Sequence, residues 1–271
     1  MASNVDTAFT GSVAAFYERY LVPLIFEPYA VDLAARVARA GPQRVLEMAA
    51  GTGVVTRQLA VMLAPSATIV ATDLNPGMLE EAARIGTERP VEWRQADAMQ
   101  LPFEAASFDA VACQFGAMFF PDKAQAFAQV RRVLRPGGLF AFNVWSAIEA
   151  NEFADAVTNA LAALYPQDPP RFLARTPHGH GDTGALTRAL AAAGFTRPSV
   201  IESVAFTSRA VSPNAVALAY CQGTPLRGEI ETRDPGGLER ATAAAEAELA
   251  RRFGNNEIEG RIEAIVVTVR A

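Results

Sequence analysis

The stretch VLEMAAGTGVVTRQLA, Val45 to Ala60, decides the fold of this chain. Val45 to Met48 reads as a short apolar strand with one carboxylate, Glu47, and Gly51-Thr52-Gly53 reads as a turn with almost no side chain. From Val54 onward the apolar residues follow a helical spacing. A strand, a glycine turn and a helix in this order predict a ligand cradle, because glycine lets the backbone approach a ligand closely and the first helical N–H groups point into the gap.

The composition allows either one large α/β domain with insertions or a core plus a cap, because 271 residues with 51% hydrophobic content can bury a sizeable core. The net charge is −5 and no run of Lys and Arg is present, so we expect no nucleic-acid partner. Cys113 and Cys221 are the only cysteines, too few for a disulfide framework or a metal cluster. We therefore expect no metal and a reducing cytosol, with Cys113 as a small core residue.

The N-terminus predicts no signal peptide, because it carries Asp6 and its first basic residue is Arg19. The longest apolar runs, such as Leu139 to Trp145, are too short to cross a bilayer. We expect a cytoplasmic protein without a membrane span, and the sequence leaves its oligomeric state open.

Predicted strands and helices alternate five times over about 100 residues, which predicts a parallel sheet with helices on both faces. The predicted strands are Val45–Met48, Thr68–Thr72, Val91–Gln95, Phe108–Cys113 and Leu139–Trp145. Asn75 and Asp122 are predicted to cap two of the helices. Ligands of such sheets bind beyond the carboxyl ends of the strands. Five residues fall at those ends: Glu47, Gly51, Asp73, Asp97 and Gln114.

The remaining chain is less regular. Pro23 and Pro28 predict an interrupted start before a short helix over residues 31–40, and Arg135 to Gly138 predicts a sharp turn before the fifth strand. Later helices are expected over residues 152–165, 185–193, 214–220 and 238–253, with loops over 166–184 and between the last two helices. Ser199–Thr207 and Arg261–Arg270 read as late strands.

Four ordered segments carry a family resemblance: VLEMAAGTG, ATDLNPGML, ADAMQLPFEAASFDAVACQFGAMFF and VRRVLRPGGLFAFNVW. They resemble motifs of class I S-adenosylmethionine-dependent methyltransferases, especially the ubiquinone/menaquinone-biosynthesis-like small-molecule group, and cover Arg44 to Trp145. The resemblance implies a Rossmann-like, mostly parallel seven-stranded sheet whose last strand is antiparallel, helices on both faces and a helical lid. The two late strands would be strands six and seven.

The resemblance also implies a cofactor, S-adenosyl-L-methionine, which leaves as S-adenosyl-L-homocysteine. The glycine turn would meet its methionine part, Asp73 its ribose hydroxyls and Asp97 its adenine amino group. The implied cofactor-binding residues are Glu47, Gly51, Thr52, Gly53, Asp73, Leu74, Met78, Asp97, Ala98 and Gln114. The chain departs from the family at Ala49, where glycine is frequent, and at Glu47, where aspartate is more frequent.

The chain is expected to be a single methyltransferase domain over residues 1–271, with a core over about 30–145, 182–210 and 258–271. Residues 1–29, 146–181 and 211–257 are predicted to form a lid over the strand ends. The expected reaction is in-line methyl transfer to a small, largely apolar organic acceptor through O, N or C. Tyr20 and Phe119 are the predicted substrate-binding residues. No catalytic residue is assigned, and the candidates are Tyr17, Tyr20, His178 and His180.

Several alternatives remain open from the residues. The N-terminal tyrosines either pack on the core or cover the cofactor, and the histidines, which flank Gly179, are either loop residues or a general base. Asp109 lies inside a predicted strand, so a structural role is expected. A catalytically silent S-adenosylmethionine-binding protein is one alternative function. A nicotinamide-dependent oxidoreductase is another, although Thr56 stands where a dinucleotide fingerprint has a small residue.

Overall fold

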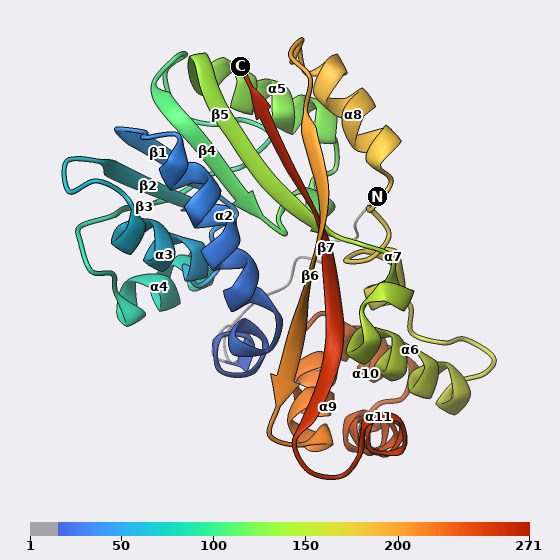
Figure 1. The fold of residues 1–271 in the computed structure, drawn as a ribbon. Helices are drawn as coiled ribbons and strands as arrows, with labels where there is room; N and C mark the ends of the chain where they lie inside the picture. The colour runs from blue at the N-terminus through green and yellow to red at the C-terminus, as the bar shows by residue number, and fades with distance from the viewer. Residues whose placement is uncertain (1–15) are drawn as a thin grey trace. The chain divides into compact units, whose positions relative to one another are not determined.

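One seven-stranded sheet organises the computed structural model, which describes residues 16–271 (Figure 1). The strand order is β3-β2-β1-β4-β5-β7-β6. The strands are β1 (Arg44–Met48), β2 (Thr68–Asp73), β3 (Glu92–Gln95), β4 (Phe108–Gln114), β5 (Leu134–Trp145), β6 (Val200–Ala210) and β7 (Ile258–Arg270). The pairs among β1 to β5 are parallel, and β7 runs antiparallel to its neighbours β5 and β6. This confirms the predicted mostly parallel sheet with an antiparallel last strand.

The helices that connect the parallel strands lie on both faces of the sheet because the strand order reverses at β1. The chain moves outward from β1 to β3 and returns to β4 on the other side, and right-handed crossovers then place the two sets of helices on opposite faces. Within this part of the chain the helices are α2 (Glu27–Arg39), α3 (Val54–Met62), α4 (Pro76–Ile85), α5 (Lys123–Val133) and α8 (Thr183–Ala192). The space between the ends of β1 and β4 is therefore the switch point at which such sheets bind ligands.

Two predicted helix caps are confirmed. The Asn75 side chain accepts a hydrogen bond from the Gly77 N–H at 2.9 Å, with Pro76 as the first residue of α4. Asp122 accepts from the Gln125 N–H at 3.0 Å at the start of α5. These caps satisfy backbone donors that a helix start leaves without a partner.

The prediction that Pro23 and Pro28 interrupt the first helical segment is wrong. Residues Tyr17–Phe26 form a π-helix, η1, that continues directly into α2. Pro23 lies inside η1, and Pro28 falls where the two helix types meet. Buried apolar side chains lie on both sides of the prolines, and this tertiary packing outweighs the local preference to end a helix.

Two other local predictions need correction. Residues 135–138 do not form a separate turn before a strand, because β5 begins at Leu134 and these residues bulge from it between the pairs Phe108–Leu134 and Ala110–Leu139. Gly137, at φ +79°, supplies the left-handed backbone that the bulge needs. The predicted loop between the last two helices contains α10 (Leu226–Arg233).

The described chain divides into two compact units. One comprises Glu27–Val144, Gly181–Ser203 and Ile265–Ala271 and holds β1 to β4 and most of β5. The other comprises the described residues up to Phe26 with Trp145–His180 and Val204–Ala264. Its helices include η3 (Ile148–Ala150), α6 (Glu152–Leu164), α7 (Phe172–Arg175), α9 (Pro213–Gln222), α10 and α11 (Leu238–Phe253), and α11 packs against α6 and α9.

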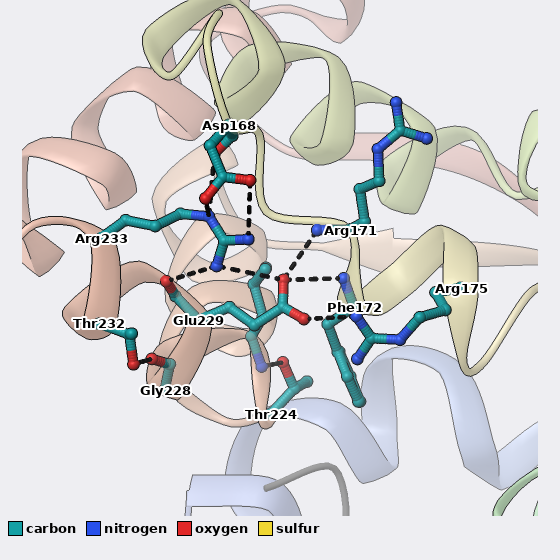
Figure 2. A network of polar contacts seen from close by, with 10 residues as sticks. Asp168, Arg171, Phe172, Arg175, Thr224, Gly228, Glu229, Thr232 and Arg233 are labelled. Atoms are coloured by element: carbon teal, nitrogen blue, oxygen red, sulfur yellow. Dashed lines mark hydrogen bonds and ion pairs between the residues drawn. The ribbon is translucent and has the colours of Figure 1, made fainter. Parts of the chain in front are cut away.

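Within the second unit, the Glu229 side chain of α10 contacts residues 171–175, the segment that precedes His178 in the sequence (Figure 2). Its carboxylate accepts from the N–H groups of Arg171 at 2.8 Å and Phe172 at 3.2 Å, and from the Arg175 guanidinium at 2.8 Å. Arg233, one turn further along α10, pairs with Asp168 at 3.0 Å. The carboxylate thus satisfies backbone donors at the start of α7, a short helix inside the segment 166–184 that is predicted to be a loop.

The first fifteen residues, including Asp6 and part of the predicted lid, lie outside the described residues. Within residues 16–271, none of the helices combines the length and the apolar character that crossing a membrane requires.

Candidate functional site

The glycine turn after β1 is built from backbone that side chains would obstruct. Gly51 and Gly53 have φ values of +56° and +83°, in the left-handed region that favours glycine. A Cβ at Gly53 would lie 2.9 Å from Cη2 of Trp93 on β3. The Ala50 N–H donates to the Thr72 carbonyl at 2.9 Å and so ties the turn to β2. The turn therefore presents backbone rather than side chains at the carboxyl end of β1.

Asp73, the last residue of β2, is oriented by this turn. Its Oδ2 accepts from the Gly51 N–H at 2.8 Å, and its Oδ1 accepts from the Asn75 N–H at 2.8 Å. Burial raises the pKa of Asp73 and outweighs the backbone N–H groups that lower it. A carboxylate accepts about four hydrogen bonds, so a fixed acceptor for hydroxyl donors remains here.

Glu47 lies beneath the turn and is 1% exposed. Its Oε2 accepts from the Thr56 hydroxyl of α3 at 2.5 Å. Burial raises the pKa of Glu47 to about 8, with a smaller raising effect from Asp73 that Thr56 and Arg57 oppose. Glu47 thus joins β1 to α3, because its carboxyl group accepts a hydrogen bond from another residue of the protein.

Two non-glycine residues directly after β1 and β4 have left-handed backbone. Ala49 has φ +52° and Phe115 has φ +49°. A Cβ at Gly116 would lie 2.4 Å from Cβ of Ala49 and 2.9 Å from Sγ of Cys113, so residue 116 has room only for glycine. Ala49, where the family often has glycine, is therefore strained and packs against Gly116.

The residues expected near the adenine lie at the ends of β2 and β3. Met78 is buried at the start of α4, whereas Leu74 is 57% exposed. Asp97 is exposed and follows β3, and its Oδ1 accepts from the Met99 N–H at 2.8 Å. Ala98, which lies between Asp97 and Met99 in the sequence, is partly exposed. These two strand ends thus carry an exposed apolar side chain, Leu74, and an exposed carboxylate, Asp97.

The end of β4 carries Gln114, which is 8% exposed and pairs in register with Asn143 of β5. The Oδ1 atom of Asn143 accepts from the Phe115 N–H at 2.9 Å. Phe119 ends the short helix η2 (Ala117–Phe119), and its N–H donates to the Gly116 carbonyl at 3.0 Å. Sequence reasoning did not single out Asn143, although an amide inside an otherwise apolar strand, LFAFNVW, is a signal that could have found it.

The four catalytic candidates, Tyr17, Tyr20, His178 and His180, lie in the unit that contains Trp145–His180, and some of them contact other aromatic rings of that unit. Tyr17 stacks on Phe26 with centroids 5.0 Å apart, Phe26 lies 6.0 Å from Trp145, and Trp145 lies 5.8 Å from His178. Tyr20 contacts Phe16 and Arg19. His180 is partly exposed. The structure thus groups Tyr17 and His178 in one aromatic cluster, Tyr17–Phe26–Trp145–His178.

His178 is held rather than solvated. Its Nδ1 lies 3.0 Å from the Ser146 carbonyl oxygen, which is an acceptor, so Nδ1 carries the proton and Nε2 carries the lone pair. Burial lowers the pKa of His178 to about 4, and the Ser146 carbonyl only partly opposes this. The imidazole is therefore neutral near pH 7.

Asp109 and Cys113 have structural surroundings. Asp109 accepts from the backbone N–H groups of Gln43 and Arg44 at 3.0 and 2.8 Å and pairs with Arg135 at 2.5 Å. These contacts brace the bulge in β5. Burial raises the pKa of the Cys113 thiol to about 12, so the thiol is a poor nucleophile. Among the described residues, no three His, Cys, Asp or Glu side chains are grouped so that they could hold a metal ion.

An adenosine-type ligand fits the strand-end residues. Asp73 offers a fixed acceptor for hydroxyl donors, and the glycine turn beside it presents backbone at positions where a side chain would be crowded or strained. Within the described chain the Oγ1 atom of Thr52 and the Nδ2 atom of Asn143 are buried without a hydrogen-bond partner, as expected of groups that a ligand completes. The fold and this site define the class of S-adenosylmethionine-dependent methyltransferases.

Comparisons with known proteins agree. Residues 46–142 match a family described as a methyltransferase domain. The demethylmenaquinone methyltransferase of Thermus thermophilus is 45% identical over 114 residues, which are 40% of this chain and 49% of that protein. The ubiquinone/menaquinone biosynthesis C-methyltransferase UbiE of Stutzerimonas stutzeri is 31% identical over 188 residues, 65% of this chain and 72% of that one.

Solved structures show the same fold. Phosphoethanolamine N-methyltransferase 2 of Haemonchus contortus, in complex with S-adenosyl-L-methionine, has a TM-score of 0.59 at 17% identity and covers 99% of this chain and 60% of its own. The chain belongs to the class I S-adenosylmethionine-dependent methyltransferases, in their UbiE-like group. S-adenosyl-L-methionine is the cofactor of this family.

Proposed function

We propose that the protein transfers the methyl group of S-adenosyl-L-methionine to a small, largely apolar organic acceptor, with a hydroquinone-type ring as the first acceptor class to test. Two relatives support this choice by name, since they methylate demethylmenaquinone or act in ubiquinone and menaquinone biosynthesis. The observation that carries the cofactor part is the Asp73 carboxylate, which the Gly51 and Asn75 N–H groups hold at 2.8 Å each.

In this proposal each strand end has one role. Asp73 accepts hydrogen bonds from the ribose hydroxyls, and Leu74 and Met78 flank the adenine. Asp97 accepts from the adenine amino group, and the Ala98 N–H donates to the adenine ring. The turn at Gly51, Thr52 and Gly53 takes the methionine part together with Gln114. Glu47 supports the turn from beneath through Thr56, rather than touching the ligand, because its carboxyl is buried and already hydrogen-bonded.

The bound cofactor supplies an electrophilic methyl group on a sulfonium sulfur. The residues of the chain contribute alignment of the reacting atoms at about 3–3.5 Å, which can lower a barrier by ~7–11 kcal/mol. A general base adds about 10²–10⁴-fold where the acceptor must lose a proton. Positioning is the larger contribution, so the reaction does not require a strong base from the protein.

Phe119 and Tyr20 are proposed to contact the acceptor, and Tyr17, Tyr20, His178 and His180 stay candidates for proton transfer. His178 has the tautomer that a base needs, with a lone pair on Nε2, although its low pKa makes it a weak base. The aromatic cluster Tyr17–Phe26–Trp145–His178 supports an apolar ring as the acceptor. A lid made of residues 1–29, 146–181 and 211–257 also stays a proposal.

The test incubates the purified protein with methyl-labelled S-adenosyl-L-methionine and a panel of hydroquinones, phenols and aliphatic amines, with the Asp73→Ala variant as the control for weakened cofactor binding. Label in an extracted ring product is expected, with less label from the variant when the cofactor is below its saturating concentration. Tight binding of S-adenosyl-L-homocysteine without label transfer to any acceptor would instead indicate a catalytically silent binding protein. Calorimetric binding of NADH without binding of S-adenosyl-L-homocysteine would overturn the proposal.

A further inference from the structure

Asn143 is a buried amide at the end of β5 whose two side-chain atoms have different surroundings. It is 0% exposed and pairs in register with Gln114 on β4. Its Oδ1 accepts from the Phe115 N–H at 2.9 Å, and the same N–H also donates to the Asn143 carbonyl at 3.2 Å. Its Nδ2 has no hydrogen-bond partner among the described residues.

The orientation of this amide is fixed. An N–H donor faces Oδ1, so exchanging the oxygen and nitrogen positions would place two donors against each other. The unpartnered group is therefore a donor, and only an acceptor atom can complete it. Buried polar groups without partners are rare in proteins, and a ligand is one of the few explanations.

The chemistry of the neighbouring strand ends narrows the acceptor. The proposed site already assigns Asp73 to the ribose and Asp97 to the adenine, and both are carboxylates that accept hydrogen bonds. The methionine part of the ligand carries the remaining strong acceptor, a carboxylate, and it is assigned to the region of Gln114, the register partner of Asn143. A neutral amide N–H is a suitable donor there, because it binds an anion without adding a charge to the core.

We propose that Asn143 is a cofactor-positioning residue whose Nδ2 donates to the carboxylate of the methionine part. Its Oδ1 accepts from Phe115, the residue with left-handed backbone that directly follows β4. This inference rests on the proposed function. It gives one side chain two tasks. Its Oδ1 fixes the backbone between Gln114 and Gly116, and its Nδ2 binds the amino-acid end of the ligand.

The test compares two nucleosides that differ in that end. S-adenosyl-L-homocysteine carries the carboxylate, and 5′-methylthioadenosine keeps the adenosine and the sulfur but lacks the amino-acid part. Both are titrated by calorimetry into wild type, Asn143→Asp and Asn143→Leu. Asn143→Asp keeps the acceptor for Phe115 and loses the donor, whereas Asn143→Leu keeps the branched shape and loses both. Asn159→Asp, at an exposed residue of α6, is the control for the added charge.

We expect both Asn143 variants to bind S-adenosyl-L-homocysteine at least about tenfold more weakly, since hydrogen bonds to charged groups are worth this much. The affinity of Asn143→Asp for 5′-methylthioadenosine should differ from that of wild type by less than about twofold. The ratio of the two affinities within one variant does not depend on how much folded protein that variant yields. Asn159→Asp should leave both affinities unchanged.

An equal loss of both affinities in Asn143→Asp would show a purely structural residue and overturn the inference, as would unchanged affinity for S-adenosyl-L-homocysteine. In either case wild-type binding leaves the proposed function standing. Wild-type protein that binds neither nucleoside would overturn the proposed function and this inference with it.

Discussion

The Asp73 carboxylate accepts a hydrogen bond from the Gly51 N–H at 2.8 Å, which joins the end of β2 to the turn after β1. The acid and the glycine turn are therefore one unit, and the same residue that is proposed to hold the ribose also fixes the turn that is proposed to hold the methionine part. Loss of Asp73 should affect both ends of the ligand.

Asp73→Ala should weaken binding of S-adenosyl-L-homocysteine by roughly 1–3 kcal/mol, because buried polar partners lose their hydrogen bonds. Isothermal titration calorimetry measures this directly. The matched control is Asp109→Ala, which removes contacts to Gln43, Arg44 and Arg135 at the opposite ends of the strands from Asp73 and should lower stability while leaving the affinity unchanged. An Asp73→Ala affinity equal to that of wild type would show that this carboxylate does not hold the ribose.

Glu47 should make stability depend on pH. Folding raises its pKa from 4.5 to about 8. Between these pH values the folded carboxyl keeps a proton that the unfolded chain has released, so the free energy of unfolding falls as the pH rises from about 4.5 to 8. Glu47→Gln should remove roughly 3–5 kcal/mol of this decline, since one pKa unit corresponds to about 1.4 kcal/mol.

Urea denaturation at several pH values between 5 and 8 checks the prediction for Glu47. The control is Glu81→Gln, because Arg84 lowers the pKa of Glu81, so this carboxyl titrates below the window. Parallel stability curves for wild type and Glu47→Gln would mean that Glu47 is charged throughout the range.

Ala49→Gly should stabilise the protein by up to about 1 kcal/mol, although this substitution usually destabilises. Ala49 has φ +52°, a conformation that costs an L-residue with a Cβ roughly 1–2 kcal/mol and costs glycine almost nothing. Thermal unfolding of the variant is the measurement. Ala35→Gly, within the right-handed helix α2, should destabilise by about 1 kcal/mol. A lower melting temperature for Ala49→Gly would contradict the strained conformation.

His178 should stay neutral down to about pH 5, because burial lowers its pKa to about 4. The folded state then holds fewer protons on this imidazole than the unfolded state between about pH 4 and 6.5, so His178 should reduce stability as the pH falls through that window. The ring chemical shifts of His178 in an NMR titration, assigned by comparison with His178→Phe, should not move between pH 8 and 5. A midpoint near 6.5 would contradict the packed, hydrogen-bonded ring.

Local patterns predicted the sheet well because the central strands β1, β2, β4 and β5 are largely apolar and several strands end in a polar or glycine signal. Asn75 and Asp122 cap helices as expected, since a cap depends only on residues two or three positions away. The continuous helix through Pro23 could not be predicted, because it is stabilised by packing against distant residues such as Ser208, whose hydroxyl donates to the Leu24 carbonyl at 2.6 Å.

The candidate site shows the same division. The acid at residue 73 and the turn at 51–53 are visible in the sequence because strand ends mark them. Asn143 was missed because its importance depends on a register with Gln114 and a bond to Phe115, 28 residues away. The left-handed backbone of Ala49 was equally hidden, since alanine is a poor indicator of positive φ.

A crystal structure of the protein with S-adenosyl-L-homocysteine tests the central claim most directly. It should show one nucleoside at the carboxyl ends of β1, β2 and β4, with both ribose hydroxyls within hydrogen-bond distance of the Asp73 carboxylate. A nucleoside bound at another place, or a site that stays empty at saturating concentration, would contradict the account.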